Sequence, residues 1–125
     1  MGQGEKMVQF RFQDLRIWQE AMSLTHELLD IADRLEERKL FRFAEQLRGS
    51  CMSMTNNIAE GSGSSSKREF SNFLNMARRS TFENANILIL LEQRRLIGKQ
   101  QLETLLGTLE LLCRKTTAFQ KTLLS

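Results

Sequence analysis

Apolar residues recur along most of this chain at intervals of three and four, which is the spacing of an amphipathic α-helix. Charged or glycine-containing stretches interrupt the pattern and divide it into four helical segments. The expected helices cover residues 14–36, 40–60, 67–96 and 99–124. Helices of this length with short connections predict an all-α protein, an antiparallel up-down-up-down four-helix bundle over residues 12–125. Residues 1–11 are expected to be a flexible N-terminal segment, with Met7 as an alternative start residue.

Single residues mark the ends of the predicted helices. Asp14 is the expected N-cap of the first helix, and Gly61 is available for a left-handed C-cap at the end of the second. Ser66 followed by Glu69 has the spacing of a capping box, which predicts the start of the third helix. Gly98 is expected to separate the third helix from the fourth, and the absence of proline agrees with an all-helical chain.

The first predicted helix carries two apolar stripes rather than one. One stripe consists of Leu15, Trp18, Met22, Thr25, Leu29 and Ala32, and the other of Ile17, Ala21, Leu24, Leu28, Ile31 and Leu35. Together they cover roughly 180–200° of the helix, whereas a helix on the surface of a monomer needs an apolar arc of about 100°. Such a helix either lies deep between its neighbours or turns one stripe toward a second subunit.

We favour the second alternative and therefore predict a homo-oligomer. The third predicted helix supports this interpretation, because it also carries a second apolar set off its main stripe. The expected interface residues are Ile17, Leu24, Leu28, Ile31, Phe82 and Ile89.

Beside its apolar stripe, the second predicted helix carries a polar stripe that is uncharged until its last residue, where a solvated face would be rich in Lys, Arg and Glu. The members of this stripe are Gln46, Ser50, Ser53, Asn57 and Glu60. Ser80 and Glu83 of the third helix have a compatible spacing if the two helices pack antiparallel. Because a buried polar group without a partner costs about 1–3 kcal/mol, we expect a polar layer between these helices. We favour a structural role for it, in fixing register or a subunit interface; the alternative is that it lines a binding groove.

The charge balance permits an acidic partner without requiring one. Eighteen Lys and Arg face fifteen Asp and Glu, which gives a net charge of +3 and an isoelectric point near 9.2. Candidate contacts to RNA or DNA are Arg48, Lys67, Arg68, Arg78, Arg79, Arg94 and Arg95. The pattern exposes no aromatic platform, so we expect contact with backbone phosphates rather than base stacking.

Sequence motifs for catalysis, metals and cofactors are missing, so we expect a protein that is not an enzyme. His26, the only histidine, lies on the polar side of its helix and lacks the Glu-x-x-His spacing of a di-iron bundle. Cys51 and Cys113 are too few for a zinc site and read as buried thiols in a reducing compartment. The turn after Gly61 does not match a phosphate-binding loop. Without a membrane span or a secretory signal, the protein is expected in the cytoplasm.

Three sequence runs resemble one known family. FQDLRIWQEA at residues 12–21, QLRGS…SMTNNIAEG at 46–61 and NMARRSTFEN at 75–84 are similar to the bacterial four-helix-bundle proteins of the 23S rRNA intervening-sequence family. The resemblance spans about residues 10–123 and implies a homo-oligomer, commonly a pentamer, without established enzymatic activity. A related group, the accessory proteins of diversity-generating retroelements, implies the alternative of a basic nucleic-acid-binding partner of a reverse transcriptase.

Overall fold

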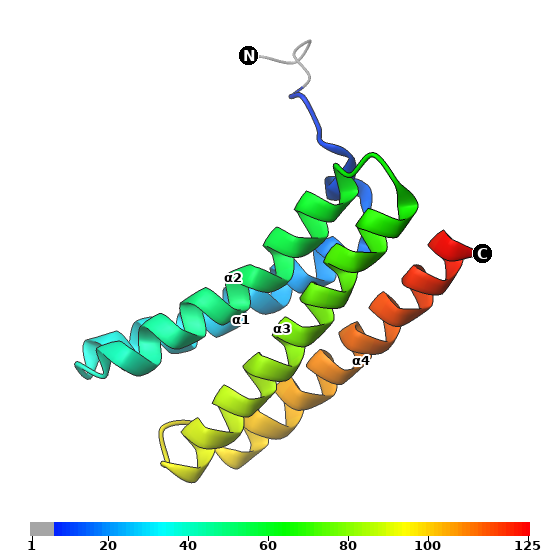
Figure 1. The fold of residues 1–125 in the computed structure, drawn as a ribbon. Coiled ribbons are helices and arrows are strands. Elements are labelled where there is room, and N and C mark those ends of the chain that lie inside the picture. Colours follow the sequence, from blue (N-terminus) through cyan, green and yellow to red (C-terminus); the bar gives the residue numbers. More distant parts are fainter. Residues whose placement is uncertain (1–6) are drawn as a thin grey trace.

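The computed structural model describes residues 7–125, and over them it confirms the all-α four-helix fold (Figure 1). The helices are a short 3-10 helix, η1 (Arg11–Asp14), followed by α1 (Arg16–Glu37), α2 (Phe41–Ser62), α3 (Lys67–Gln93) and α4 (Lys99–Leu124). No strand occurs in this part of the chain. The expected bounds of the fourth helix are confirmed at both ends, whereas α3 ends three residues earlier than expected.

The four helices pack as two hairpins, α1 with α2 and α3 with α4. The centre of the molecule is the contact between α2 and α3, while α4 packs mainly on α3 and meets α1 over a short stretch. In Figure 1 the turn between α1 and α2 (cyan) and the turn between α3 and α4 (yellow) lie well apart. The hairpins therefore cross at an angle, and α4 is the helix with the least cover from the rest of the chain.

The predicted helix caps agree with the structure at one position and differ from it at another. Asp14 belongs to η1, and the N-cap of α1 is Leu15, so the predicted Asp14 cap is wrong. The Ser66 cap is confirmed, because the Ser66 hydroxyl accepts a hydrogen bond from the Glu69 amide at 3.1 Å. The chain reverses after α3 through Arg95, whose φ of 60° is the left-handed conformation that glycine usually supplies.

Gly61 lies inside α2 and has no positive φ, so its expected role as a left-handed cap is wrong. Its function is close approach instead. A Cβ atom built on Gly61 would lie 2.7 Å from the Cβ of Phe73 and 2.9 Å from a ring carbon of Phe70, both on α3. The glycine thus allows α3 to pack directly against the backbone at the end of α2.

The second stripe of α1 forms the core of the single chain, which corrects the predicted interface. Ile17, Leu24, Leu28 and Ile31 are all buried, with exposed fractions of 6% or less. Their side chains are covered by the other helices of the same molecule and cannot contact a second subunit in this conformation. The alternative of a helix lying deep between its neighbours is the correct one for this stripe. Leu15, Trp18, Met22 and Leu29 of the other stripe are half-buried.

Within residues 7–125, the helices lack the combination of length and apolar character that a membrane-spanning helix needs. Residues 1–6 of the predicted flexible segment lie outside the described residues. Arg11 does not fit that prediction, because its guanidinium donates to the carbonyl oxygen of Ser62 at the end of α2. Cations are favoured at this negative end of a helix dipole, so Arg11 ties η1 to α2.

Candidate functional site

The predicted polar layer exists between α2 and α3, with a smaller membership than expected. The hydroxyl groups of Ser53 and Ser80 are hydrogen-bonded across the two helices at 2.8 Å. The Asn57 amide donates to the Ser53 hydroxyl at 3.0 Å and to the Ser53 carbonyl oxygen at 2.9 Å. The Ser53–Ser80 contact joins α2 to α3, the two helices that the sequence pattern placed side by side, and Asn57 holds Ser53 from within α2.

Asn84 is the deepest residue of this layer, and the sequence prediction left it out. Its side chain is fully buried, and its amide nitrogen donates to the carbonyl oxygens of Ser50 at 3.2 Å and Ser80 at 2.9 Å. The Asn84 Oδ1 and the Ser50 hydroxyl are buried without a hydrogen-bond partner in the described structure. The sequence does carry a signal for Asn84, because Ser80 and Asn84 interrupt the apolar stripe of their helix.

Gln46, Glu60 and Glu83 are exposed and form no hydrogen bond with this layer among the described residues, so their predicted membership is wrong. Ser50 is buried as expected, although its backbone carbonyl rather than its hydroxyl makes the contact. The layer consists of hydroxyl and amide groups, which lack the basicity of a general base at neutral pH. The geometry therefore fits a packing role that fixes the register of α2 against α3.

Arg48 is engaged inside the molecule, which contradicts its predicted contact with nucleic acid. Its guanidinium lies 2.9 Å from the Asp33 carboxylate, 2.5 Å from Glu36 and 2.8 Å from Glu45. The hydrogen bonds that the guanidinium donates to these three carboxylates, to Asp33 above all, hold the pKa of Arg48 above its usual value. Arg48 thus joins α1 to α2 and has little capacity left for a phosphate.

The six other predicted nucleic-acid contacts remain accessible but do not form one cluster. They are Lys67, Arg68, Arg78, Arg79, Arg94 and Arg95. Within residues 7–125 none of them forms an ion pair. Lys67 lies at the start of α3 and Arg94 just after its end, which at 1.5 Å per residue separates them by about 40 Å. The three pairs of adjacent basic residues therefore form separate positively charged sites along α3 and just after its end.

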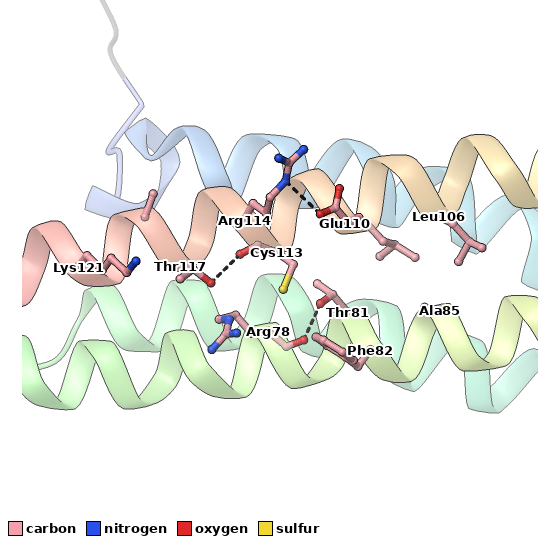
Figure 2. A pocket seen from close by; sticks show the side chains of 12 residues that line it. Arg78, Thr81, Phe82, Ala85, Leu106, Glu110, Cys113, Arg114, Thr117 and Lys121 are labelled. Carbon is pink, nitrogen blue, oxygen red and sulfur yellow. Dashed lines mark hydrogen bonds and ion pairs between the residues drawn. The ribbon is translucent and has the colours of Figure 1, made fainter.

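A groove of about 690 Å³ runs between α3 and α4 (Figure 2). It is lined by Arg78, Thr81, Phe82 and Ala85 of α3 and by Leu106, Leu109, Glu110, Cys113, Arg114, Thr117, Ala118 and Lys121 of α4. Its surface is mostly apolar, and its charged side chains come from both helices. Arg114 is paired with Glu110 at 3.0 Å, whereas Arg78 and Lys121 form no ion pair within residues 7–125.

Phe82 borders this groove with 67% of its surface exposed. A smaller hollow of about 390 Å³ lies beside it and is lined by Asn75, Arg78, Arg79 and Phe82. The expectation of no exposed aromatic platform does not hold at Phe82, because residues 7–125 leave its ring largely uncovered. Ile89, seven residues further along α3, is 38% exposed. For Phe82 and Ile89 the assignment to a subunit interface stays a prediction.

The two cysteines are free thiols in different environments. Cys51 is buried in the core as expected, and burial raises the pKa of its thiol to about 11. Cys113 is half-buried and lines the α3–α4 groove, where its sulfur is visible in Figure 2. Within residues 7–125, no three His, Cys, Asp or Glu side chains gather as metal ligands would.

Comparison with known proteins supports the resemblance noted in the sequence. No curated protein matches the chain. A crystal structure of a Bacteroides thetaiotaomicron protein, described as of unknown function and from the S23 ribosomal protein family, has the same fold with a TM-score of 0.79. The two sequences are 23% identical, and the match covers 84% of this chain and 98% of that one. The sequence model of the 23S rRNA-intervening sequence protein family matches residues 13–118, so this chain belongs to that family.

Proposed function

We propose that this protein is a non-enzymatic subunit of a homo-oligomer whose copies associate through the α3–α4 groove. The observation that carries the proposal is the apolar groove of about 690 Å³ with Phe82 largely exposed at its edge. An apolar surface of this kind is unfavourable in water, and larger exposed apolar patches are typical of interaction sites. Covering a Phe side chain contributes about 1.5–3 kcal/mol.

A second copy of the chain is the occupant best supported by the molecule itself. A groove between two adjacent helices accepts a third helix, because helix axes pack about 8–10 Å apart. The chain offers such a helix in α1, where Trp18, Met22 and Leu29 are half-buried and keep part of their apolar surface exposed. The resemblance to the family favours a pentamer, and five subunits of 14.5 kDa would give a molar mass of about 73 kDa.

Molar mass in solution tests this proposal. Phe82→Ser removes the exposed ring without changing charge, and we expect it to weaken each contact by about 2 kcal/mol, roughly 30-fold in the association constant. Phe41→Ser is the matched control, because Phe41 is 57% exposed at the start of α2, away from the groove. Light scattering over a range of concentrations should show dissociation of the Phe82 variant alone. A wild-type protein that is monomeric at all concentrations would remove the proposal.

A second candidate function, binding of RNA or DNA as an accessory protein, has support from the charge distribution. Residues 67–125 contain ten Lys and Arg against five Glu, a net charge of +5. Such a surface attracts phosphates with an affinity that falls steeply with salt. Arg78→Glu with Arg79→Glu should reduce the retention of RNA on a filter at low salt. Arg34→Glu with Arg38→Glu makes the same charge change at the end of α1, and this variant should retain more RNA than the Arg78 and Arg79 variant. Equal retention by the two variants would argue against α3 as the RNA contact.

The two free thiols are compatible with a reducing compartment such as the cytoplasm. Mass spectrometry of protein alkylated directly in cell extracts would test this placement. Full alkylation of Cys113 is the expected result, because its half-buried sulfur lines an open groove. Cys113 found in a disulfide would argue against it.

A further inference from the structure

Charge is divided unequally between the two hairpins. Helix α1 contains six Asp and Glu against two Arg, a net charge of −4. The part of the chain that builds the groove, residues 67–125, carries +5. The molecule therefore presents one acidic helix and one basic hairpin, and the apolar groove lies in the basic part.

Unpaired charges border the groove. Arg78 and Lys121 line it without an ion pair among the described residues, and the hydrogen bond that the Arg78 guanidinium donates to the Asn75 side-chain oxygen, at 3.3 Å, is to an uncharged group. A guanidinium left in this condition favours a carboxylate as its partner, because the planar fork of Arg matches a carboxylate closely. The groove thus combines an apolar floor with cations that can receive an acidic, partly apolar surface.

Helix α1 has the complementary pattern. Met22 and Leu29 are seven residues apart and share one line along the helix, and both are half-buried. Asp30 and Glu37, also seven residues apart, form the neighbouring line. Both carboxylates are exposed and form no ion pair within residues 7–125. An apolar line beside an acidic line is what the groove requires from its occupant.

Two arrangements of identical copies can be compared on this basis. A two-fold contact of groove with groove would place Arg78 and Lys121 of both copies in one interface, where like charges repel each other. A contact of groove with α1 instead joins opposite charges and covers apolar surface on both sides. We propose that the α3–α4 groove of one copy receives the acidic face of α1 of the next, which rests on the proposed function and makes the contact head-to-tail.

A head-to-tail contact has a consequence for the assembly. Each copy then uses two different surfaces, so a series of contacts closes into a ring or continues as a filament, and it does not stop at two. Each end of an open series keeps one unfilled surface, either a groove or an α1.

Charge reversal with mixing tests the polarity of the contact. One variant carries Asp30→Lys with Glu37→Lys, and the other carries Arg78→Glu with Lys121→Glu. At low salt each variant alone should need at least a tenfold higher concentration for half-assembly than the wild type. An equimolar mixture should assemble at a clearly lower concentration than either variant alone, because each altered surface then meets an opposite charge. A closed ring of five cannot alternate fully and keeps one like-charged contact, so recovery should stop short of the wild-type concentration.

The controls separate this inference from the proposed function. Lys67→Glu with Lys99→Glu makes the same charge change as the groove variant, but at helix starts outside the groove, and should assemble normally. Circular dichroism establishes that each variant keeps its helices. If Phe82→Ser dissociates the assembly while Asp30→Lys with Glu37→Lys does not, the groove binds another surface and only the polarity is overturned. If the mixture needs as high a concentration for assembly as each variant alone, with both variants folded, the proposed polarity is overturned as well.

Discussion

The side-chain amide of Asn84 on α3 donates to the backbone carbonyl oxygen of Ser50 on α2 at 3.2 Å, in a position from which solvent is fully excluded. The same amide also donates to the Ser80 carbonyl oxygen one turn earlier on α3. The hydrogen bonds of this single polar side chain therefore fix the position of α2 along α3. A shift of one helix along the other would leave this amide buried without its partner.

Replacing Asn84 by aspartate should destabilise the fold strongly at neutral pH. The carboxylate has nearly the same shape, but it would be buried against the carbonyl oxygens of Ser50 and Ser80, which cannot donate to it. We expect the free energy of unfolding to fall by about 3 kcal/mol or more at pH 7. The loss should shrink as the pH approaches 4, because burial raises the pKa of such a carboxyl group and the protonated form can donate.

Urea denaturation at several pH values measures this effect, with Asn84→Ala as the control. The alanine variant loses the same hydrogen bonds but has no titratable group, so its cost of about 2 kcal/mol should not change with pH between 4 and 7. If the stability deficit of Asn84→Asp proved independent of pH, the buried position of this side chain would be contradicted.

Gly61→Ala should destabilise the protein although alanine is the better helix former. The added methyl group would meet the Cβ of Phe73 at 2.7 Å, so α3 must move away from α2. Overpacking of this kind costs about 1–3 kcal/mol, which exceeds the gain in helix propensity of about 1 kcal/mol.

Gly49→Ala is the matched control on the same helix, because nothing lies within 4 Å of its Cβ position. We expect this variant to be more stable than the wild type by about 1 kcal/mol. Thermal or urea denaturation distinguishes the two substitutions by sign. Equal stabilisation by both would show that α2 and α3 do not approach each other closely at Gly61.

The buried thiol of Cys51 should make the fold less stable in mildly alkaline solution. Its pKa is about 11 in the folded protein and 9.0 in an exposed reference state. Below pH 9 both states keep the proton, so stability does not depend on this group. As the pH rises from 9 toward 11 the unfolded chain loses the proton first, and the free energy of unfolding falls by up to about 3 kcal/mol.

The alkaline loss is measured by urea denaturation at pH 8, 9 and 10 and compared with Cys51→Ala. The alanine variant lacks the thiol, so its stability curve should decline less steeply over this range, even though its small cavity lowers stability at every pH. Parallel curves for the two proteins would mean that Cys51 is accessible to solvent in the folded state.

Leu24→Ala should lower the stability of the single chain without acting on an interface. Leu24 is 1% exposed and lies in the common core, where removal of a leucine side chain costs about 2–5 kcal/mol. Chemical denaturation should detect this loss, while light scattering of the folded variant should give the wild-type molar mass. Dissociation of a folded Leu24 variant would return this stripe of α1 to the subunit interface.

Helical periodicity predicts the elements well because it depends on residues close in sequence. The bounds of α4 and the Ser66 cap of α3 follow from spacings of three and four residues within one segment. The same information gives the angle of each side chain around its own helix. It does not say which neighbour that angle faces, and for this reason the pattern alone assigns Leu24 and Leu28 to a second subunit.

The candidate site is predictable only where one helix carries the signal by itself. The polar stripe of α2 leads to Ser53 and its partner Ser80 on α3, and to Asn57, which donates to Ser53. The Arg48 ion pairs with Asp33 and Glu36 join different helices, so the sequence pattern of one helix does not predict that this guanidinium is already paired. The groove likewise requires α3 and α4 together, and neither helix alone predicts it.

The peripheral position of α4 has a kinetic consequence. Helix α2 is packed between α1 and α3, whereas α4 rests mainly on α3 and meets α1 over a short stretch. Local opening requires less free energy where fewer apolar contacts must break. Backbone amides of α4 should therefore exchange with deuterium sooner than those of α2. An occupant of the groove would slow exchange in α4 more than in the other helices. Assembly would therefore set the rate at which α4 opens locally.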